Sequence, residues 1–254
     1  MNKLSYTIAL ALTYFNLTQL LANGNETIES YQEAKAHLYE VFKTTGGKTL
    51  YCDCRHRNRV IDATSCGYIP VTNNERARRT EVEHMVPASA FGHSFKEWLH
   101  SEQFPQCSRT HGKRKRGRDC ARTNPEFRRM EADMYNLWLT IGELNAHRAN
   151  YPINTIPGEV RNYGSCDFEV WDQQVEPRPE ARGIMARAYL YMDSSYPGRG
   201  IIPNERFRKL LKEWSKEFPV NATERQWAEE ILRIQGNCNP FVLTCSLSST
   251  QLFP

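Results

Sequence analysis

The stretch Glu81-Val82-Glu83-His84-Met85-Val86-Pro87 decides how the rest of this 254-residue chain is interpreted. Its apolar and β-branched residues predict a strand over residues 80–86. A histidine can take a proton from water near neutral pH, and a neighbouring carboxylate can hold a hard divalent cation. A single Glu-His pair at a strand edge is most often without function, and it indicates a site only when a second feature accompanies it.

That second feature is the segment NLWLTIGELNAHR, which runs from Asn136 to Arg148. Residues 142–149 are predicted to form a short helix that carries Asn145. An asparagine offers a metal an uncharged oxygen, although asparagines more often cap helices or form turns. Asn136 lies nine residues before Asn145 and would occupy the opposite side of a continuous helix, so we expect it to precede the helix.

One geometric condition follows for the first stretch. Adjacent residues of a regular strand point to opposite faces, so Glu83 and His84 can reach one site only if the strand ends or bulges there. Pro87 favours an early end, because proline donates no hydrogen bond to a strand ladder.

Taken together, six stretches in a fixed order carry a resemblance that spans residues 28–245. They are EVEHMVP (81–87), FGH (91–93), MEADMYNL (130–137), GELN (142–145), ARG, AR and YLYM within 181–192, and QGN with NPF within 235–241. In these motifs the chain resembles the bacterial endonuclease I family of exported nucleases, whose site is a ββα-metal (His-Me) finger. The resemblance and the element pattern together predict an α+β fold: one mixed, helix-rich, disulfide-stabilised domain over residues 23–254 that contains such a finger.

The resemblance also implies roles for single residues. His84 matches the general base that activates water, and Glu83 and Asn145 match the two protein ligands of one magnesium ion, for which manganese or calcium can substitute in binding. Glu81 and Asn136 match supporting residues at the catalytic site. An arginine just before the cysteine of the basic loop is expected to contact the phosphate. The match there is shifted, so Arg118 is preferred and Arg116 is the alternative.

The net charge of +4 hides a strong asymmetry along the chain. Between residues 51 and 130, 16 lysines and arginines stand against 9 acids, an excess of +7. The residues expected to bind nucleic acid form two clusters: Lys113, Arg114, Lys115 and Arg116, and Arg76, Arg78 and Arg79. Such clusters bind phosphates without reading sequence, and no base-reading motif is recognisable. We therefore expect DNA as the partner, with RNA left open, and a monomeric protein.

Residues 1–22 are interpreted as a signal peptide, because Lys3 precedes an apolar run and Ala22 offers a small residue for cleavage. An uncleaved anchor helix is the alternative. After cleavage no membrane span is expected, and the protein would be periplasmic or secreted. In such a compartment eight cysteines predict up to four disulfides. A zinc site at Cys52, Cys54 and His56, with Cys66, is the competing interpretation.

Residues 101–123 lack apolar periodicity and are predicted to form a long basic loop, which a disulfide between Cys107 and Cys120 would restrain. The sequence departs from the family pattern near its end, where Cys238 stands in place of a histidine and is inferred to pair with Cys245. Further helices are expected over 31–43 with Ser30 as cap, 125–134 with Asn124 as cap and Pro125 at the first position, 181–192, 207–218, and after Thr223 as cap. Short strands are expected at 49–51 and 68–71.

The resulting hypothesis is an exported, magnesium-dependent, sequence-nonspecific endonuclease. A one-metal mechanism would hydrolyse phosphodiesters and leave 5′-phosphate and 3′-hydroxyl ends. The alternative hypothesis is a non-catalytic extracytoplasmic protein that binds nucleic acid on the same scaffold.

Overall fold

The computed structural model describes residues 23–108, 114–158 and 160–245. The predicted signal peptide, residues 1–22, and Lys113 of the basic loop lie outside the described residues. Within them, helices surround three two-stranded antiparallel sheets, so the prediction of a mixed, helix-rich fold is confirmed. The strand pairs are β1 (His56–Arg57) with β2 (Val60–Ile61), β3 (Thr80–His84) with β4 (Leu137–Ile141), and β5 (Phe168–Trp171) with β6 (Gln174–Pro177).

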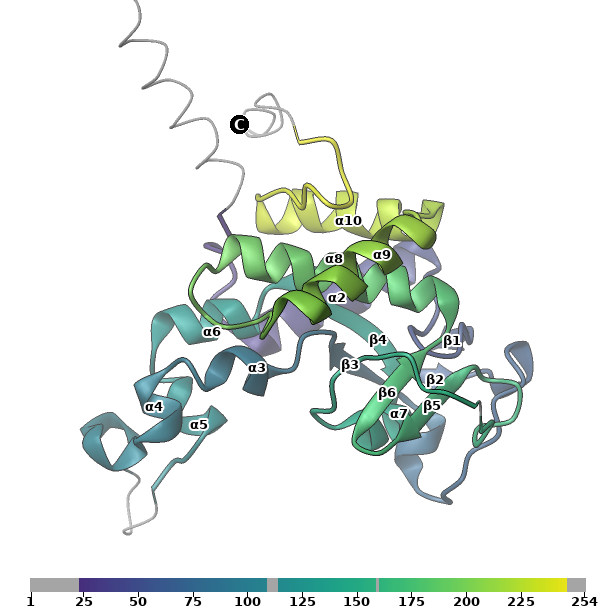
Figure 1. Ribbon diagram of the computed structural model, residues 1–254, viewed down its shortest axis with the longest axis horizontal. Helices are drawn as coiled ribbons and strands as arrows, with labels where there is room; N and C mark the ends of the chain where they lie inside the picture. The colour runs from purple at the N-terminus through teal and green to yellow at the C-terminus, as the bar shows by residue number, and fades with distance from the viewer. Residues whose placement is uncertain (1–22, 109–113, 159, 246–254) are drawn as a thin grey trace, which may run out of the picture.

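The helices divide into long ones that form a layer and short ones that flank the strands. The α-helices are α2 (Tyr31–Thr45), α3 (Ala88–Gly92), α4 (Lys96–Leu99), α5 (Arg118–Ala121), α6 (Pro125–Glu131), α7 (Gly142–Arg148), α8 (Pro179–Ser195), α9 (Glu205–Glu217) and α10 (Ala222–Gln235). The 3₁₀ turns are η1 (Ala63–Ser65), η2 (Glu75–Arg78), η3 (Ser101–Gln103), η4 (Pro105–Cys107) and η6 (Met134–Asn136). Figure 1 shows α2, α8, α9 and α10 above β3 and β4, with α4 and α5 to one side and β5, β6 and α7 to the other.

The core forms where α2 and α10 pack on β4. All five residues of β4 are buried. Trp138 of β4 makes an edge-to-face contact with Phe42 of α2, with ring centroids 5.3 Å apart, and its ring lies 4.8 Å from that of Trp227 of α10. These large aromatic rings remove much apolar area from water and so fix β4, and the antiparallel β3 beside it, against the helical layer.

Capping residues define both ends of helix α2. The Ser30 side chain accepts a hydrogen bond from the Glu33 amide at 3.2 Å, as predicted, and Gly46 ends the helix with a φ of 65° that favours glycine. The cap predicted for α10 is wrong. Asn221, and not Thr223, caps this helix by accepting from the Glu224 amide at 2.9 Å.

Helix α2 also covers β3 along the side away from β4. The hydroxyl groups of Tyr31 and Tyr39 donate to the carbonyl oxygens of Val82 and Thr80, each at 3.3 Å. These two contacts satisfy strand carbonyls that have no strand partner on that side.

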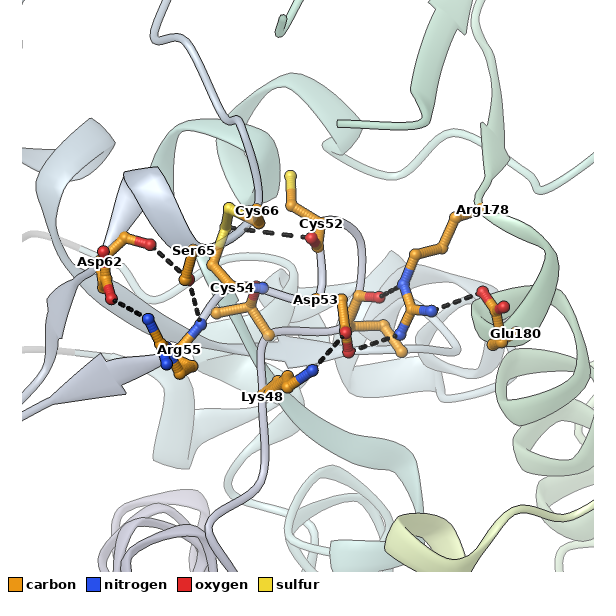
Figure 2. A network of polar contacts seen from close by, with 12 residues as sticks. Lys48, Cys52, Asp53, Cys54, Arg55, Asp62, Ser65, Cys66, Arg178 and Glu180 are labelled. Carbon is orange, nitrogen blue, oxygen red and sulfur yellow. Dashed lines mark hydrogen bonds and ion pairs between the residues drawn. A yellow bond between two sulfur atoms is a disulfide. The ribbon is translucent and has the colours of Figure 1, made fainter. Parts of the chain in front are cut away.

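The strands predicted at 49–51 and 68–71 are not strands. Residues 49–54 form a tight turn in which the amides of Thr49 and Asp53 donate to the carbonyls of Cys54 and Thr49, respectively. Disulfides at Cys52 and Cys54 hold this turn, and Arg178 pairs with Asp53 on its other side (Figure 2). In the second segment the backbone amides of residues 71 and 72 bond to the carboxylate of Glu143 instead of to a strand.

Four disulfides join all eight cysteines. The inferred pairs Cys107–Cys120 and Cys238–Cys245 are both confirmed. The other two are Cys52–Cys166 and Cys54–Cys66. The zinc interpretation is therefore wrong, because its three cysteines are used in disulfide bonds and a metal needs thiolates.

The basic segment 101–123 is more ordered than predicted. Its described part contains η3, η4 and α5, and Cys107–Cys120 ties η4 to α5. The helix that follows is capped by Asn124 with Pro125 at its first position, as predicted, but it ends at Glu131 and not near residue 134. Asp133 causes this early end, because its side chain accepts from the Tyr135 amide and begins the separate turn η6. Among the described helices, none is long and apolar enough to cross a membrane.

Candidate active site

His84 is the last residue of β3, so the strand ends two residues before its predicted limit at residue 86. This early end follows both Glu83 and His84 and does not turn their side chains to one face. The register with β4 runs without a bulge from Thr80 to His84. Beyond the strand, the guanidinium of Arg148 donates to the carbonyl oxygens of His84 at 2.9 Å and Met85 at 2.8 Å. This buried arginine thus holds the backbone at the point where the chain leaves the sheet.

The imidazole of His84 is nearly buried and has a defined tautomer. Its Nε2 lies 2.8 Å from the carbonyl oxygen of Glu131, and a carbonyl can only accept, so Nε2 carries the proton and Nδ1 is the basic nitrogen. Burial, and secondarily the charge of Arg118, lowers the pKa of His84 to about 3. The ring is therefore neutral at physiological pH, with Nδ1 unprotonated.

Two arginines share the carboxylate of Glu131 next to His84. Arg118 donates to one carboxylate oxygen, and Arg122 donates to both at 2.8 Å. The Glu131 side chain is 2% exposed, whereas each arginine side chain is 38% exposed. Arg122 also pairs with Asp119 at 3.3 Å, so two carboxylates face the two guanidinium groups. Both arginines nevertheless present partly exposed donors at the surface beside the imidazole. Arg116, the alternative phosphate contact, is exposed and lies farther back along the loop.

Glu83 lies on the other face of β3. Its Oε1 accepts from the Tyr51 hydroxyl at 2.8 Å and lies 3.1 Å from the Arg148 guanidinium, and both Glu83 and Arg148 are 2% exposed. Burial raises the pKa of Glu83, while the charge of Arg148 and the hydrogen bond from Tyr51 oppose that rise. Glu83 and His84 thus have different side-chain neighbours, as their alternation along the strand requires.

Glu81 lies on the same face of β3 as Glu83, two residues earlier. The structure brings three other predicted site residues to its carboxylate. Its carboxylate accepts from Arg76 at 2.7 Å, from Arg79 at 3.1 Å and from the Asn145 amide nitrogen at 3.1 Å. Burial would raise the pKa of Glu81, but these hydrogen bonds outweigh it and lower the pKa. Arg78 instead donates to Asn73 at 2.6 Å.

The donor set on this face suits a hard cation. The carboxylates of Glu81 and Glu83 project from alternate positions of β3, and Asn145 reaches the same face from α7 with an amide oxygen available besides the nitrogen that bonds Glu81. Among the described residues no three histidine, cysteine, aspartate or glutamate side chains gather into a metal centre. A small oxygen set completed by water is the arrangement that Mg²⁺ favours.

Asn136 lies just before β4, in η6, and therefore precedes α7 as expected. Its side chain accepts from the Val86 amide at 2.6 Å and donates to the Val86 carbonyl at 3.0 Å, while its own carbonyl accepts from the Met85 amide at 2.9 Å. Asn136 therefore fixes the backbone immediately after His84.

The remaining basic residues of the loop lie at the surface. Arg114 is exposed and donates to the Ser101 carbonyl at 2.8 Å, and the Lys115 amide donates to the Cys107 carbonyl at 2.7 Å. A cavity of about 890 Å³ lies elsewhere, between α3, α9 and residues 150–155, and none of His84, Arg118 and Asn145 lines it. The candidate active site therefore lies outside this cavity, and its partly exposed groups are the side chains of Arg118 and Arg122.

Comparison with known proteins decides the family. The family model of endonuclease I matches residues 13–245. The chain belongs to the endonuclease I family. It is 34% identical over 244 residues to a protein of Aeromonas hydrophila named periplasmic deoxyribonuclease, covering 92% of this chain and 93% of that protein. It is 36% identical over 226 residues to an extracellular deoxyribonuclease of the same species (85% and 89%). It is 34% identical over 223 residues to Endonuclease-1 of Buchnera aphidicola subsp. Acyrthosiphon pisum (85% and 82%).

In this member of the endonuclease I family, four residues join the site that the sequence interpretation did not assign: Tyr31, Arg122, Glu131 and Arg148. Glu131 and Arg148 stand inside quoted motifs, so their position offered a signal. Arg122 follows Cys120 by two residues, just as Arg118 precedes it by two, so the spacing to this cysteine offered the same signal for both arginines. Tyr31 lies 53 residues before His84, and nothing local in its sequence distinguishes it from the first residue of any helix.

Proposed function

We propose that the protein is an exported, sequence-nonspecific endonuclease that hydrolyses DNA phosphodiesters, with RNA as a further substrate to be tested. Membership of the endonuclease I family and the names of its relatives support a nuclease. The observation that carries the proposal is local: a neutral imidazole at His84 lies next to a partly exposed arginine pair.

His84 is the general base in this proposal. Its Nδ1 takes a proton from water, which then attacks phosphorus in line with the departing 3′ oxygen, leaving 5′-phosphate and 3′-hydroxyl ends. Arg118 contacts the phosphate and stabilises its developing charge, with Arg116 as the alternative. The contact of Arg118 with Glu131, whose carbonyl also holds His84, supports Arg118 over Arg116.

The unit β3–β4–α7 would serve as the ββα-metal finger. Glu83 and Asn145 would hold one divalent ion, for which Mg²⁺ is the first candidate, with Glu81 and Asn136 as supporting residues. When bound, the ion would neutralise charge on the phosphate and on the departing oxygen. The positions of Glu81 and Glu83 on one face of β3, and the hydrogen bond from Asn145 of α7 to Glu81, support this assignment.

The location and the partners complete the proposal. Relatives named periplasmic or extracellular, and four disulfides, support action outside the cytoplasm after removal of residues 1–22. The exposed cations of residues 114–116 and of Arg76, Arg78 and Arg79 would bind the DNA backbone without reading its sequence, and a monomer suffices for this chemistry.

Digestion of supercoiled plasmid tests the function. We expect wild-type protein to cut plasmid with Mg²⁺ and to stop in EDTA, with labelling of the products revealing 5′-phosphate ends. His84→Ala should bind DNA but not cut it. Intact plasmid in every reaction, together with DNA binding by the wild type, would instead favour the non-catalytic nucleic-acid-binding protein. Parallel digests of single-stranded DNA and RNA define the substrate range.

A further inference from the structure

Tyr31 lies between the two groups assigned to the reaction. Its ring centroid is 4.9 Å from that of the His84 imidazole, with the planes tilted by 33°. The Arg118 guanidinium lies over the same ring, 5.6 Å from its centroid. One aromatic ring therefore contacts both the base and the phosphate-binding arginine.

The two groups come from separate parts of the fold. His84 ends β3, Arg118 begins the short helix α5 after the basic loop, and Tyr31 is the first residue of α2. The Tyr31 hydroxyl donates to the Val82 carbonyl at 3.3 Å, which anchors the ring to the strand that carries His84. Burial raises the pKa of Tyr31 to about 12, so this hydroxyl stays protonated at physiological pH and can donate to the Val82 carbonyl.

We propose that Tyr31 is a positioning residue whose ring sets the spacing between the His84 imidazole and the Arg118 guanidinium. The inference rests on the proposed nuclease function. The ring offers its faces to an imidazole and to a cation, both of which aromatic faces attract. A reaction that needs base and phosphate aligned is sensitive to displacements of about 1 Å, which can cost about a hundredfold in rate.

The same helix supplies a matched control. Tyr39 lies eight residues later on α2, its hydroxyl donates to the Thr80 carbonyl at 3.3 Å, and the Arg59 guanidinium lies 5.0 Å from its ring centroid. Tyr39 thus repeats the anchoring of α2 to β3 and the cation–ring contact, but its ring is stacked on no imidazole that the structure describes.

The test compares kcat and KM for plasmid nicking in Mg²⁺ by wild type, Tyr31→Leu, Tyr31→Phe and Tyr39→Leu. Tyr31→Leu should lower kcat about tenfold to a hundredfold and change KM little, because most DNA affinity comes from other phosphate contacts. Tyr31→Phe keeps both ring faces and should stay within about threefold of wild type. Tyr39→Leu should leave kcat within about twofold. Melting temperatures identify any unfolded variant, and Tyr31→Met then replaces Tyr31→Leu.

The outcomes separate the two proposals. Wild-type kcat in folded Tyr31→Leu overturns the positioning role while the nuclease function stands. The same holds if Tyr31→Phe is as slow as Tyr31→Leu, or if Tyr39→Leu loses as much kcat as Tyr31→Leu. A wild-type protein that does not cut DNA, or His84→Ala that cuts it normally, overturns the nuclease function and the positioning role with it.

Discussion

Two glutamate–arginine contacts flank the end of β3, and they differ in the exposure of their arginines. On one face Glu83 meets Arg148, and both side chains are 2% exposed. On the other, Glu131 meets Arg118 and Arg122, which are each 38% exposed. The first is a balanced, buried pair that also binds the backbone of His84. The second includes Asp119, which pairs with Arg122 at 3.3 Å, and it presents two partly exposed guanidinium groups that an anionic substrate can reach.

The difference in exposure indicates a structural role for the buried pair and a substrate-binding role for the exposed arginines. A buried pair gains little net stability over apolar packing, but removal of one partner leaves an uncompensated charge. An exposed arginine adds little to stability but can bind phosphate with two parallel hydrogen bonds. Substitutions on the two faces should therefore separate stability from activity.

The largest effect is expected at Arg148. Arg148→Met leaves Glu83 buried without its cation and frees the carbonyls of His84 and Met85, so the free energy of unfolding should fall by about 3–5 kcal/mol. Urea denaturation followed by circular dichroism measures this change. A decrease of less than about 1 kcal/mol would show that the contacts of Arg148 with Glu83 and with the backbone of His84 do not stabilise the fold.

Arg118→Met should reverse that pattern. Removal of one charge-stabilising donor should lower kcat about a hundredfold, whereas the unfolding free energy should change by less than about 1 kcal/mol because Arg122 still pairs with Glu131. Plasmid nicking and urea denaturation on the same preparation measure both. The matched variant Arg116→Met, on the exposed loop, should retain most of the activity. The reverse ranking of the two variants would move the phosphate contact to Arg116.

The pH dependence of the stability of Glu131→Gln tests the contacts of Glu131 with Arg118 and Arg122. Burial would raise the pKa of Glu131, but hydrogen bonds from Arg122 and the charge of Arg118 lower it below the ordinary value. A lowered carboxyl pKa stabilises the fold above the ordinary pKa of about 4.3 and loses this effect as pH falls toward the folded-state value. The free energy of unfolding of the wild type should exceed that of Glu131→Gln by about 1.5–3 kcal/mol at pH 7. This difference in stability should become smaller toward pH 3. A gap independent of pH would exclude an ionised Glu131.

The smallest effect concerns the exposed loop cations. Replacing Arg114, Lys115 and Arg116 with alanine should weaken DNA binding, and the slope of log K against log salt should become shallower by about 0.9 for each phosphate that the variant no longer neutralises. Fluorescence anisotropy at several salt concentrations, in EDTA to prevent cleavage, measures the slope. An unchanged slope would mean that these cations do not bind DNA phosphates.

The sequence predicted what is local in this fold. Ser30 caps α2, Asn124 and Pro125 begin α6, and the apolar stripe of α9 predicted its span to within a few residues. The buried strand β4 was missed because LWLTI is a continuous apolar run with no alternation, which strands buried on both sides share with helix segments. Its GELN continuation was correctly predicted as the helix α7.

The contacts across the fold could not be predicted in the same way. His84, Glu83 and Asn145 were found from motifs, but the partner of Glu83 was not, because Arg148 faces it only after α7 packs on β3. Tyr31 reaches His84 through tertiary packing alone. The strand predicted at 68–71 failed because its amides have separate partners. Those of Tyr68 and Ile69 donate to the carbonyls of Ala63 and Tyr163, and that of residue 71 donates to the Glu143 carboxylate.

Chemical rescue of His84→Gly tests directly whether His84 is the general base. The initial rate of plasmid nicking in Mg²⁺ is measured for this variant with increasing imidazole. Removal of a general base should lower the rate about 10²–10⁴-fold, and imidazole should restore part of it in proportion to its concentration while leaving the wild type unaffected. Wild-type nicking by His84→Gly without imidazole would contradict the assignment of His84 as the base.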